Sequence, residues 1–161
     1  MQRHIGGDVN GPRGGITYAS IALTSGGVPA IAYFRRGSFD PATMTESGPR
    51  EVVDDGRPAA DEPWHPQSFP GAQSSIAFTP SGKIELAYQD ATPVDLVIAS
   101  WNPATNTRAS RRSLRTQGSA GFYPRLALDG TGNAYISSAT IKAATAQLAA
   151  NQLFVDVTPA P

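Results

Sequence analysis

The sequence predicts an all-β fold built from repeated antiparallel sheets. A stretch of sixteen residues occurs three times, at Tyr18–Tyr33, Gln73–Tyr88 and Tyr123–Ser138. The first and second copies start 55 residues apart and the second and third 50 residues apart, a period typical of stacked supersecondary units. Composition agrees with this fold class, because 16 Gly and 14 Pro among 161 residues interrupt the chain with turns.

Each copy of the repeat predicts a β-hairpin. Apolar runs such as Ser20–Leu23 and Ser75–Phe78 have the length of a strand and are too short for a helix. A polar turn follows, in which the aligned Gly27, Gly82 and Gly132 can supply the positive φ of a hairpin with a bulge. The returning strands are Val28–Tyr33, Ile84–Tyr88 and Ala134–Ile136.

The second copy continues into two further strands. Asp95–Trp101 predicts a third strand and Thr107–Leu114 a polar, outer fourth strand, joined by a turn at 102–106. Four antiparallel strands in about fifty residues form one blade of a β-propeller. We therefore expect a single propeller-like domain over residues 1–161, with about three four-stranded blades at about 18–66, 73–115 and 123–157.

The first and third copies are less regular. In the first, Glu51–Asp54 is the expected fourth strand, within a stretch at 37–66 that is rich in Pro, Gly and acidic residues. In the third, Leu153–Val157 is the expected third strand. The Ala-rich stretch Ile141–Gln152 favours helix by composition, and we expect a long turn or a single helical turn there, with a short helix as the alternative.

Three blades are fewer than the four to eight that close a propeller ring. The chain is therefore expected to be an incomplete ring or a piece of a larger one, or else to assemble with a second copy. If the chain assembles with a second copy, the N-terminal strand Gln2–Ile5 would complete the partner's last blade by strand exchange, and the homodimer would have six blades.

The pattern S-I-A-L-x-x-x-G-x-P-x-I-A-Y at Ser20–Tyr33, with its counterparts Ser75–Tyr88 and Tyr123–Ile136 and the later strand Asp95–Trp101, resembles the β-propeller repeats of large bacterial secreted or cell-surface proteins. The resemblance covers a little over half of the chain and departs at Ser138, where an aromatic residue is expected. It implies an extracellular location, although the first fifteen residues lack the apolar core of a secretory signal, so the compartment stays open. Such blades occur in lectins, sialidase-like hydrolases and adhesion scaffolds, so the resemblance implies architecture rather than a ligand.

Charge and composition exclude several classes of function. Thirteen basic and thirteen acidic residues cancel, so we expect neither a nucleic acid nor a membrane surface as partner. The chain has no cysteine, which excludes disulfides and thiolate sites, and no apolar run approaches the ~20 residues of a membrane span. It also has no Gly-rich phosphate loop and no nucleophile elbow, so no cofactor is expected.

Asp129 and Asn133 are candidate calcium ligands, because they place oxygen atoms at alternating positions of a turn. The second acid and the distal Glu of a complete calcium loop are missing, so the expected role of both residues is to build the hairpin turn. Sialidase-like chemistry would need an arginine cluster, a Tyr nucleophile with a Glu partner, and an Asp. The available residues, none of them in a positioning motif, are Tyr33, Arg35, Arg36, Glu85, Tyr88 and Arg125.

The long loop of the first copy contains the candidate ligand-binding residues Trp64, His65 and Phe69. Aromatic faces suit the apolar faces of sugars, whereas Trp101 at the end of a strand is expected in the core. Acidic residues flank His65 and offer a second, weaker metal hypothesis: Asp54, Asp55, Asp61 and Glu62. The basic strand with Arg108, Arg111, Arg112 and Arg115 is expected to protect a sheet edge from unwanted pairing.

These observations favour a non-enzymatic binding module that recognises a glycan or a protein through its loops. Two alternatives remain: a segment of a sialidase-like or other propeller glycoside hydrolase without a complete catalytic site, and a structural self-assembly unit. No residue is assigned a catalytic role.

Overall fold

The structure is a computed structural model that describes residues 16–35, 53–54, 68, 70–141 and 151–159. All regular secondary structure in these residues is β-strand, which confirms the all-β prediction, and they include no helix able to cross a bilayer. The strands are β1 (Ile16–Leu23), β2 (Pro29–Arg35), β3 (Pro70–Phe78), β4 (Ile84–Asp90), β5 (Asp95–Asn102), β6 (Thr107–Arg115), β7 (Ser119–Leu128), β8 (Ala134–Ile141) and β9 (Asn151–Thr158).

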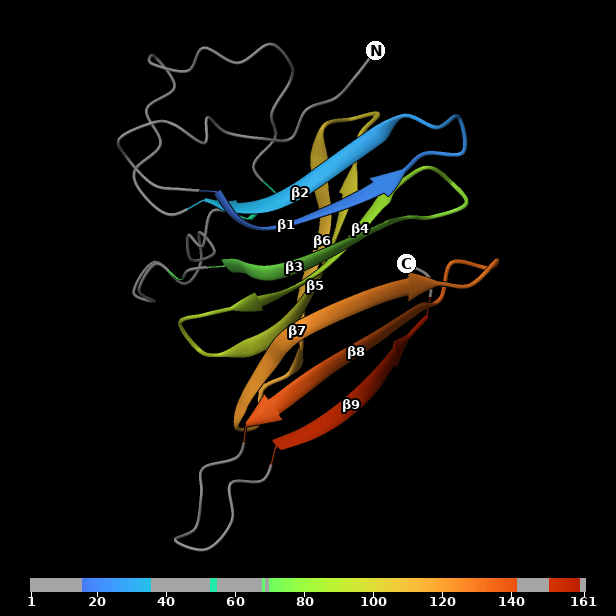
Figure 1. The fold of residues 1–161 in the computed structure, drawn as a ribbon. Coiled ribbons are helices and arrows are strands. Elements are labelled where there is room, and N and C mark those ends of the chain that lie inside the picture. The colour runs from blue at the N-terminus through green and yellow to red at the C-terminus, as the bar shows by residue number, and fades with distance from the viewer. Residues whose placement is uncertain (1–15, 36–52, 55–67, 69, 142–150, 160–161) are drawn as a thin grey trace, which may run out of the picture.

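The strands form three antiparallel sheets whose order follows the chain (Figure 1). The first sheet is β1-β2, the middle sheet is β3-β4-β5-β6, and the third sheet is β7-β8-β9. The three predicted hairpins are confirmed as β1–β2, β3–β4 and β7–β8. The further strands predicted at 95–101, 107–114 and 153–157 are confirmed as β5, β6 and β9.

Within the described residues, only the middle sheet has the four strands that were predicted for every blade. Val53 and Asp54, the end of the expected fourth strand Glu51–Asp54 of the first blade, have no strand conformation; Val53 packs on the front face of the middle sheet and Asp54 accepts a hydrogen bond from Tyr88. Glu51 and Val52, the N-terminal strand Gln2–Ile5 and residues 142–150 of the expected turn lie outside the described residues.

The three hairpin turns have the same geometry. Their glycines, Gly27, Gly82 and Gly132, have φ values of 76°, 81° and 90°, as predicted for the bulged turn. In each turn the residue three positions earlier closes the loop through its backbone N–H, which donates to the carbonyl four residues on at 2.9 to 3.0 Å. The sequence repeat is therefore also a repeat of turn conformation.

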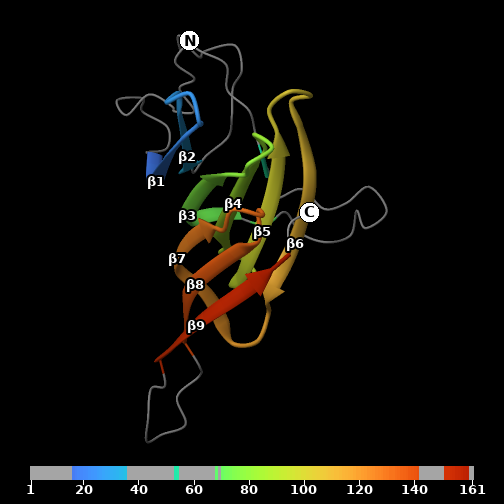
Figure 2. The ribbon, with the colours of Figure 1, turned by 90° about the vertical axis from the view of Figure 1, so that its right-hand side faces the viewer.

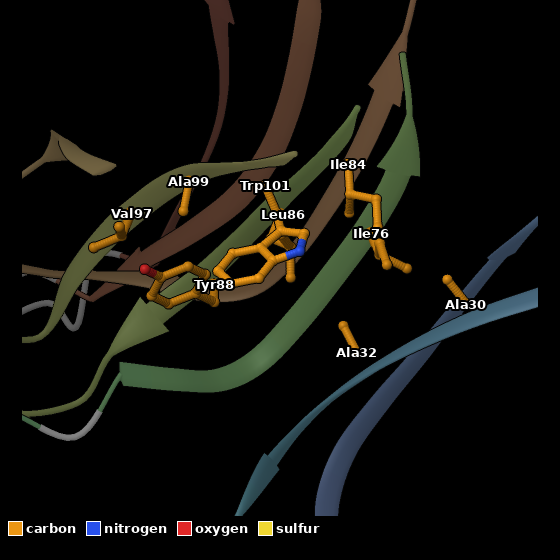
Figure 3. Packing of buried hydrophobic residues seen from close by; sticks show 9 residues of the cluster. All are labelled: Ala30, Ala32, Ile76, Ile84, Leu86, Tyr88, Val97, Ala99 and Trp101. Atoms are coloured by element: carbon orange, nitrogen blue, oxygen red, sulfur yellow. The ribbon is translucent and has the colours of Figure 1, made fainter. Parts of the chain in front are cut away.

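The sheets stack face to face, with the middle sheet between the other two (Figures 1 and 2). We call the face of each sheet that points toward the start of the chain its front face, and the opposite one its back face. On the front face of the middle sheet, Trp101 and its apolar neighbours pack against Ala30 and Ala32 of β2 (Figure 3). The buried neighbours are Ile76, Ile84, Leu86, Tyr88, Val97 and Ala99. The small alanines permit this close approach of the two sheets.

The back face of the middle sheet packs against the front face of the third sheet. Ala87, Leu96 and Ile98 form one buried cluster with Ala134 and Ile136 of β8. Leu126 and Leu128 of β7 and Leu114 of β6 pack around this cluster. Full burial of a Leu or Ile side chain contributes about 1.5–3 kcal/mol, so these contacts hold the sheets together.

The first strand of every sheet carries a register shift at the same place. The shifts lie between Thr17 and Ser20, between Ala72 and Ser75, and between Phe122 and Arg125. Gln73 and Tyr123, at equivalent positions, have φ values of 53° and 52°. The backbone N–H of Tyr123 donates to Oε1 of Gln73, and that of Leu126 donates to Oγ of Ser75 at 3.0 Å. These bonds link β3 to β7 and fix the position of the third sheet.

Candidate functional site

A polar cluster that joins residues far apart in the sequence lies on the front face of the middle sheet. We call it the Asp54 cluster, and it consists of Asp54, Tyr88, Asp90 and Arg111. The Tyr88 hydroxyl donates to Oδ2 of Asp54 at 2.5 Å, and Nε of Arg111 donates to the same oxygen at 2.6 Å. Nη2 of Arg111 donates to Oδ2 of Asp90 at 2.8 Å, so one guanidinium joins two buried carboxylates.

Electrostatics in the Asp54 cluster favour a fixed structural tie. Burial raises the pKa of Tyr88 strongly, and the charge of Asp54 raises it further, so the hydroxyl stays protonated. Burial acts to lower the pKa of Arg111, but the hydrogen bond and charge of Asp54 outweigh it and raise the pKa. Neither group is prepared to exchange a proton near neutral pH. The cluster instead anchors the Val53–Asp54 segment, whose Val53 packs against the apolar core.

Tyr88 and Glu85 do not form the nucleophile pair of a sialidase-like site. They are three positions apart on β4, and side chains alternate between the faces of a strand, so they point to opposite faces. Tyr88 belongs to the cluster that packs on the first sheet, whereas Glu85 accepts a hydrogen bond from the Ser100 hydroxyl on the back face. Burial raises the pKa of Glu85, and the Ser100 bond and the charges of Lys83 and Arg112 only partly offset it.

The other described sialidase candidates lie on the first and third sheets, whereas Tyr88 and Glu85 lie on the middle sheet. Nη1 of Arg125 donates to the carbonyl of the preceding Pro124 at 3.0 Å. Tyr33 on β2 is half-buried, Arg35 ends β2, and Arg36 lies outside the described residues. Of the three candidate arginines, only Arg125 has a side chain in the described part of the structure, and this side chain contacts its own strand.

Strand β6 carries the predicted line of arginines at an edge of the middle sheet. Besides Arg111, Arg115 makes a specific contact: its Nη2 donates to Oδ1 of Asp156 at 2.6 Å, and its guanidinium lies 3.7 Å from the ring centre of Phe154. Arg115 thus ties the middle sheet to β9 of the third sheet. Sequence reasoning missed Asp90 and Asp156 as partners, because nothing in their local sequence marks them.

Asp129 and Asn133 act as turn residues, as expected. Oδ1 of Asp129 accepts hydrogen bonds from the backbone N–H of Thr131 and of Asn133, both at 2.9 Å. Oδ2 accepts from Nδ2 of Asn133 at 2.8 Å. The Thr131 and Asn133 side-chain bonds hold the pKa of Asp129 well below its usual range. Thr24 and Thr79 accept the same backbone bond with Oγ1 in the other two turns, at 3.0 Å each.

The candidate ligand-binding residues Trp64, His65 and Phe69 lie outside the described residues, as do Asp55, Asp61 and Glu62. In the part of the chain that the structure describes, no group of three or more His, Cys, Asp or Glu residues is placed to hold a metal ion. Trp101 is buried in the core, as expected. Comparison with protein-family models, with curated proteins and with solved structures found no match for this chain.

Proposed function

We propose that this chain is a non-enzymatic interaction module of the β-propeller type, in which the three sheets are successive blades. The proposal is supported by the repetition of one packing arrangement: the back face of each sheet lies on the front face of the next. It is also supported by the equivalent bulges and turns of the three hairpins. Such an arrangement leaves the turns at the sheet ends available for binding.

The observation that carries the non-enzymatic part is the placement of Tyr88 and Glu85 on opposite faces of β4. Each is buried and held by a structural partner, Asp54 for Tyr88 and Ser100 for Glu85. A catalytic carboxylate and nucleophile must converge on one substrate atom. Groups that are separated by the thickness of a sheet do not meet this requirement.

The partner that we propose is a glycan or a protein bound through the loops. Support for a glycan comes from the sequence, which places Trp64 and Phe69 in a Pro-rich stretch whose aromatic faces suit sugar rings. A glycan array tests this choice. Binding that is lost in Trp64→Ala and kept in Tyr123→Asn, a control that removes another exposed aromatic, would identify the glycan ligand. Binding that both variants retain would rule out Trp64 as its contact.

Turnover assays with sialosides and aryl glycosides test the non-enzymatic assignment. We expect no turnover by the wild-type chain or by Tyr88→Phe, which keeps the buried ring and removes only the hydroxyl. Turnover by the wild type that Tyr88→Phe abolishes would instead assign the chain to a propeller hydrolase.

Structural self-assembly is a second candidate function, favoured by the exposed apolar side chains at both ends of the stack. It is compatible with the interaction module, because a sheet that binds the next sheet within the chain presents the same kind of surface to another chain.

A further inference from the structure

Among the described residues, both ends of the sheet stack have exposed apolar side chains. On the front face of the first sheet, Ile21 and Leu23 of β1 are 63% and 60% exposed. On the back face of the third sheet, the exposed fractions are 78% for Leu153, 63% for Val155, 62% for Val157 and 41% for Tyr135. Groups of exposed apolar side chains mark interaction surfaces in soluble proteins. Each end is therefore a candidate docking surface.

The back face of the third sheet is equivalent to a face that is covered in the middle sheet. In the middle sheet Ala87 pairs with Ile98, and in the third sheet the aligned Ser137 pairs with Val155. The same register makes Leu153 the counterpart of Leu96. Leu96 and Ile98 are buried beneath the third sheet, whereas their counterparts on β9 are exposed. The third sheet thus presents the surface with which a sheet of this repeat binds its successor.

The front face of the first sheet is equivalent to the front faces of the middle and third sheets, which are both covered. Ile21 aligns with Ile76 and Leu126, which both pack against the preceding sheet. Leu23 aligns in the same way with Phe78 and Leu128. The alternation of β1 confirms the direction, because Ala22 packs on the middle sheet and its neighbours Ile21 and Leu23 point away. The first sheet therefore presents the surface with which a sheet of this repeat binds its predecessor.

We propose that the back face of the third sheet binds the front face of the first sheet in a second copy of this chain, head to tail. The binding partner follows from the register. The exposed back face of the third sheet is equivalent to the back face of the middle sheet, and the latter is covered by a front face of the same repeat. The chain's own first sheet does not reach it, because the middle sheet separates the two (Figure 1). This inference rests on the proposed function in treating the sheets as successive blades.

Two copies can satisfy both surfaces of each chain at once. Every copy has one free front face and one free back face, so a dimer with two identical contacts leaves neither exposed. Such a dimer has six sheets, within the four to eight that close a propeller ring. This contact joins sheet faces, and it therefore does not require the strand exchange expected for Gln2–Ile5.

Sedimentation equilibrium of the 161-residue chain over the micromolar range tests the proposal. We expect the mass of two copies for the wild type and of one copy for Leu23→Asp and for Val155→Asp, because each places a carboxylate in the apolar contact. Both positions are exposed in the single chain, so folding should persist, which circular dichroism would check. Ala104→Asp, in the exposed β5–β6 turn, is the matched control and should remain dimeric.

Mixing the two variants distinguishes head-to-tail docking from other modes of association. The intact back face of Leu23→Asp should bind the intact front face of Val155→Asp, so the mixture should regain a two-copy mass that neither variant shows alone. A wild-type chain with a one-copy mass would overturn the proposal. A Leu23→Asp chain that still forms dimers would also overturn it, because its back faces would then bind each other. A mass that grows steadily with concentration would overturn it as well, because the two-copy ring would then not close.

Failure of the docking proposal and failure of the non-enzymatic assignment can be told apart. Glycoside turnover would overturn the non-enzymatic assignment without changing the mass of the chain. A one-copy mass would overturn the docking proposal and would leave the turnover assays as they are.

Discussion

At position 129 the third hairpin has an aspartate where the other two hairpins have Thr24 and Thr79. All three side chains accept a hydrogen bond from the backbone N–H four residues later. A carboxylate at this position suits a cation, yet its oxygen atoms are occupied by Thr131 and Asn133 of the same turn. Comparison with the equivalent turns therefore favours a structural role at the residue scale.

Asp129→Ala should lower the melting temperature, because the turn loses its acceptor, whereas Asp129→Thr, the residue type of the other turns, should retain most of the stability. Because the folded-state pKa of Asp129 is depressed, its contribution is complete above the unfolded pKa of about 3.9 and is lost as pH falls through the lower folded value. Thermal melts at several pH values check the pH dependence, and melts with and without Ca²⁺ check whether the role of Asp129 is structural. A wild-type melting temperature that rises with Ca²⁺, but not in Asp129→Thr, would contradict the structural role.

Glu85 is a buried carboxylate on the back face of the middle sheet, with a pKa raised chiefly by burial. A raised folded-state pKa means that its contribution to stability is greatest below the unfolded pKa and is lost as pH rises through the folded value. Glu85→Gln removes the loss of stability at high pH, because glutamine does not ionise, and it keeps an acceptor for the Ser100 hydroxyl.

We therefore expect the stability of Glu85→Gln relative to the wild type to increase with pH. Urea unfolding at several pH values from about 4 to about 8 measures the difference. Ser100→Ala serves as the companion variant, since it removes the bond that lowers the pKa of Glu85 and should steepen the pH dependence. Parallel curves for the wild type and Glu85→Gln would show that burial does not perturb this carboxyl.

At the element scale, the hairpins could be predicted because apolar runs and turn glycines recur in the sequence. The register shifts of β1, β3 and β7 could not, because Gln73 and Tyr123 are not residue types that favour positive φ. Their conformation depends on the neighbouring sheet, where Gln73 supplies an acceptor for the Tyr123 N–H. The Asp54 cluster was likewise beyond prediction, because it joins residues 34 and 57 positions apart from Asp54.

Gly121 on β7 lies close to the backbone of β5 in the middle sheet. Its φ is +79°, and an added Cβ would lie 2.9 Å from Cα of Leu96 and 3.0 Å from the carbonyl oxygen of Asp95 on β5. Gly121→Ala should therefore destabilise the chain by about 2 kcal/mol or more in urea unfolding. Gly130→Ala, with no atom within 4 Å of the added Cβ, should stay within about 0.5 kcal/mol of the wild type. Equal effects of the two substitutions would show that β7 does not approach β5 this closely.

At the scale of the whole molecule, one packing rule describes both interfaces between sheets. In both interfaces an alanine on the back face of one sheet, Ala32 or Ala87, shares a buried cluster with apolar residues on the front face of the next sheet, such as Leu86 or Ile136. The sequence predicted the repeated unit, because the unit is local. The strand count and the resemblance to propeller repeats predicted successive blades, but not which residues meet, since face-to-face contacts join residues far apart in the sequence. Glu51, Val52 and Gln2–Ile5, which were expected in fourth strands of the outer sheets, lie outside the described residues.

Methyl–methyl nuclear Overhauser spectroscopy on a chain labelled at Ala, Ile, Leu and Val methyls tests the central claim most directly, namely that the three sheets pack front on back. The account predicts cross-peaks from Ala30 and Ala32 to the Ile76, Ile84 and Leu86 methyls, and from Ala87 to Ile136. Cross-peaks that are confined to single sheets, with none between Ala87 and Ile136, would contradict it.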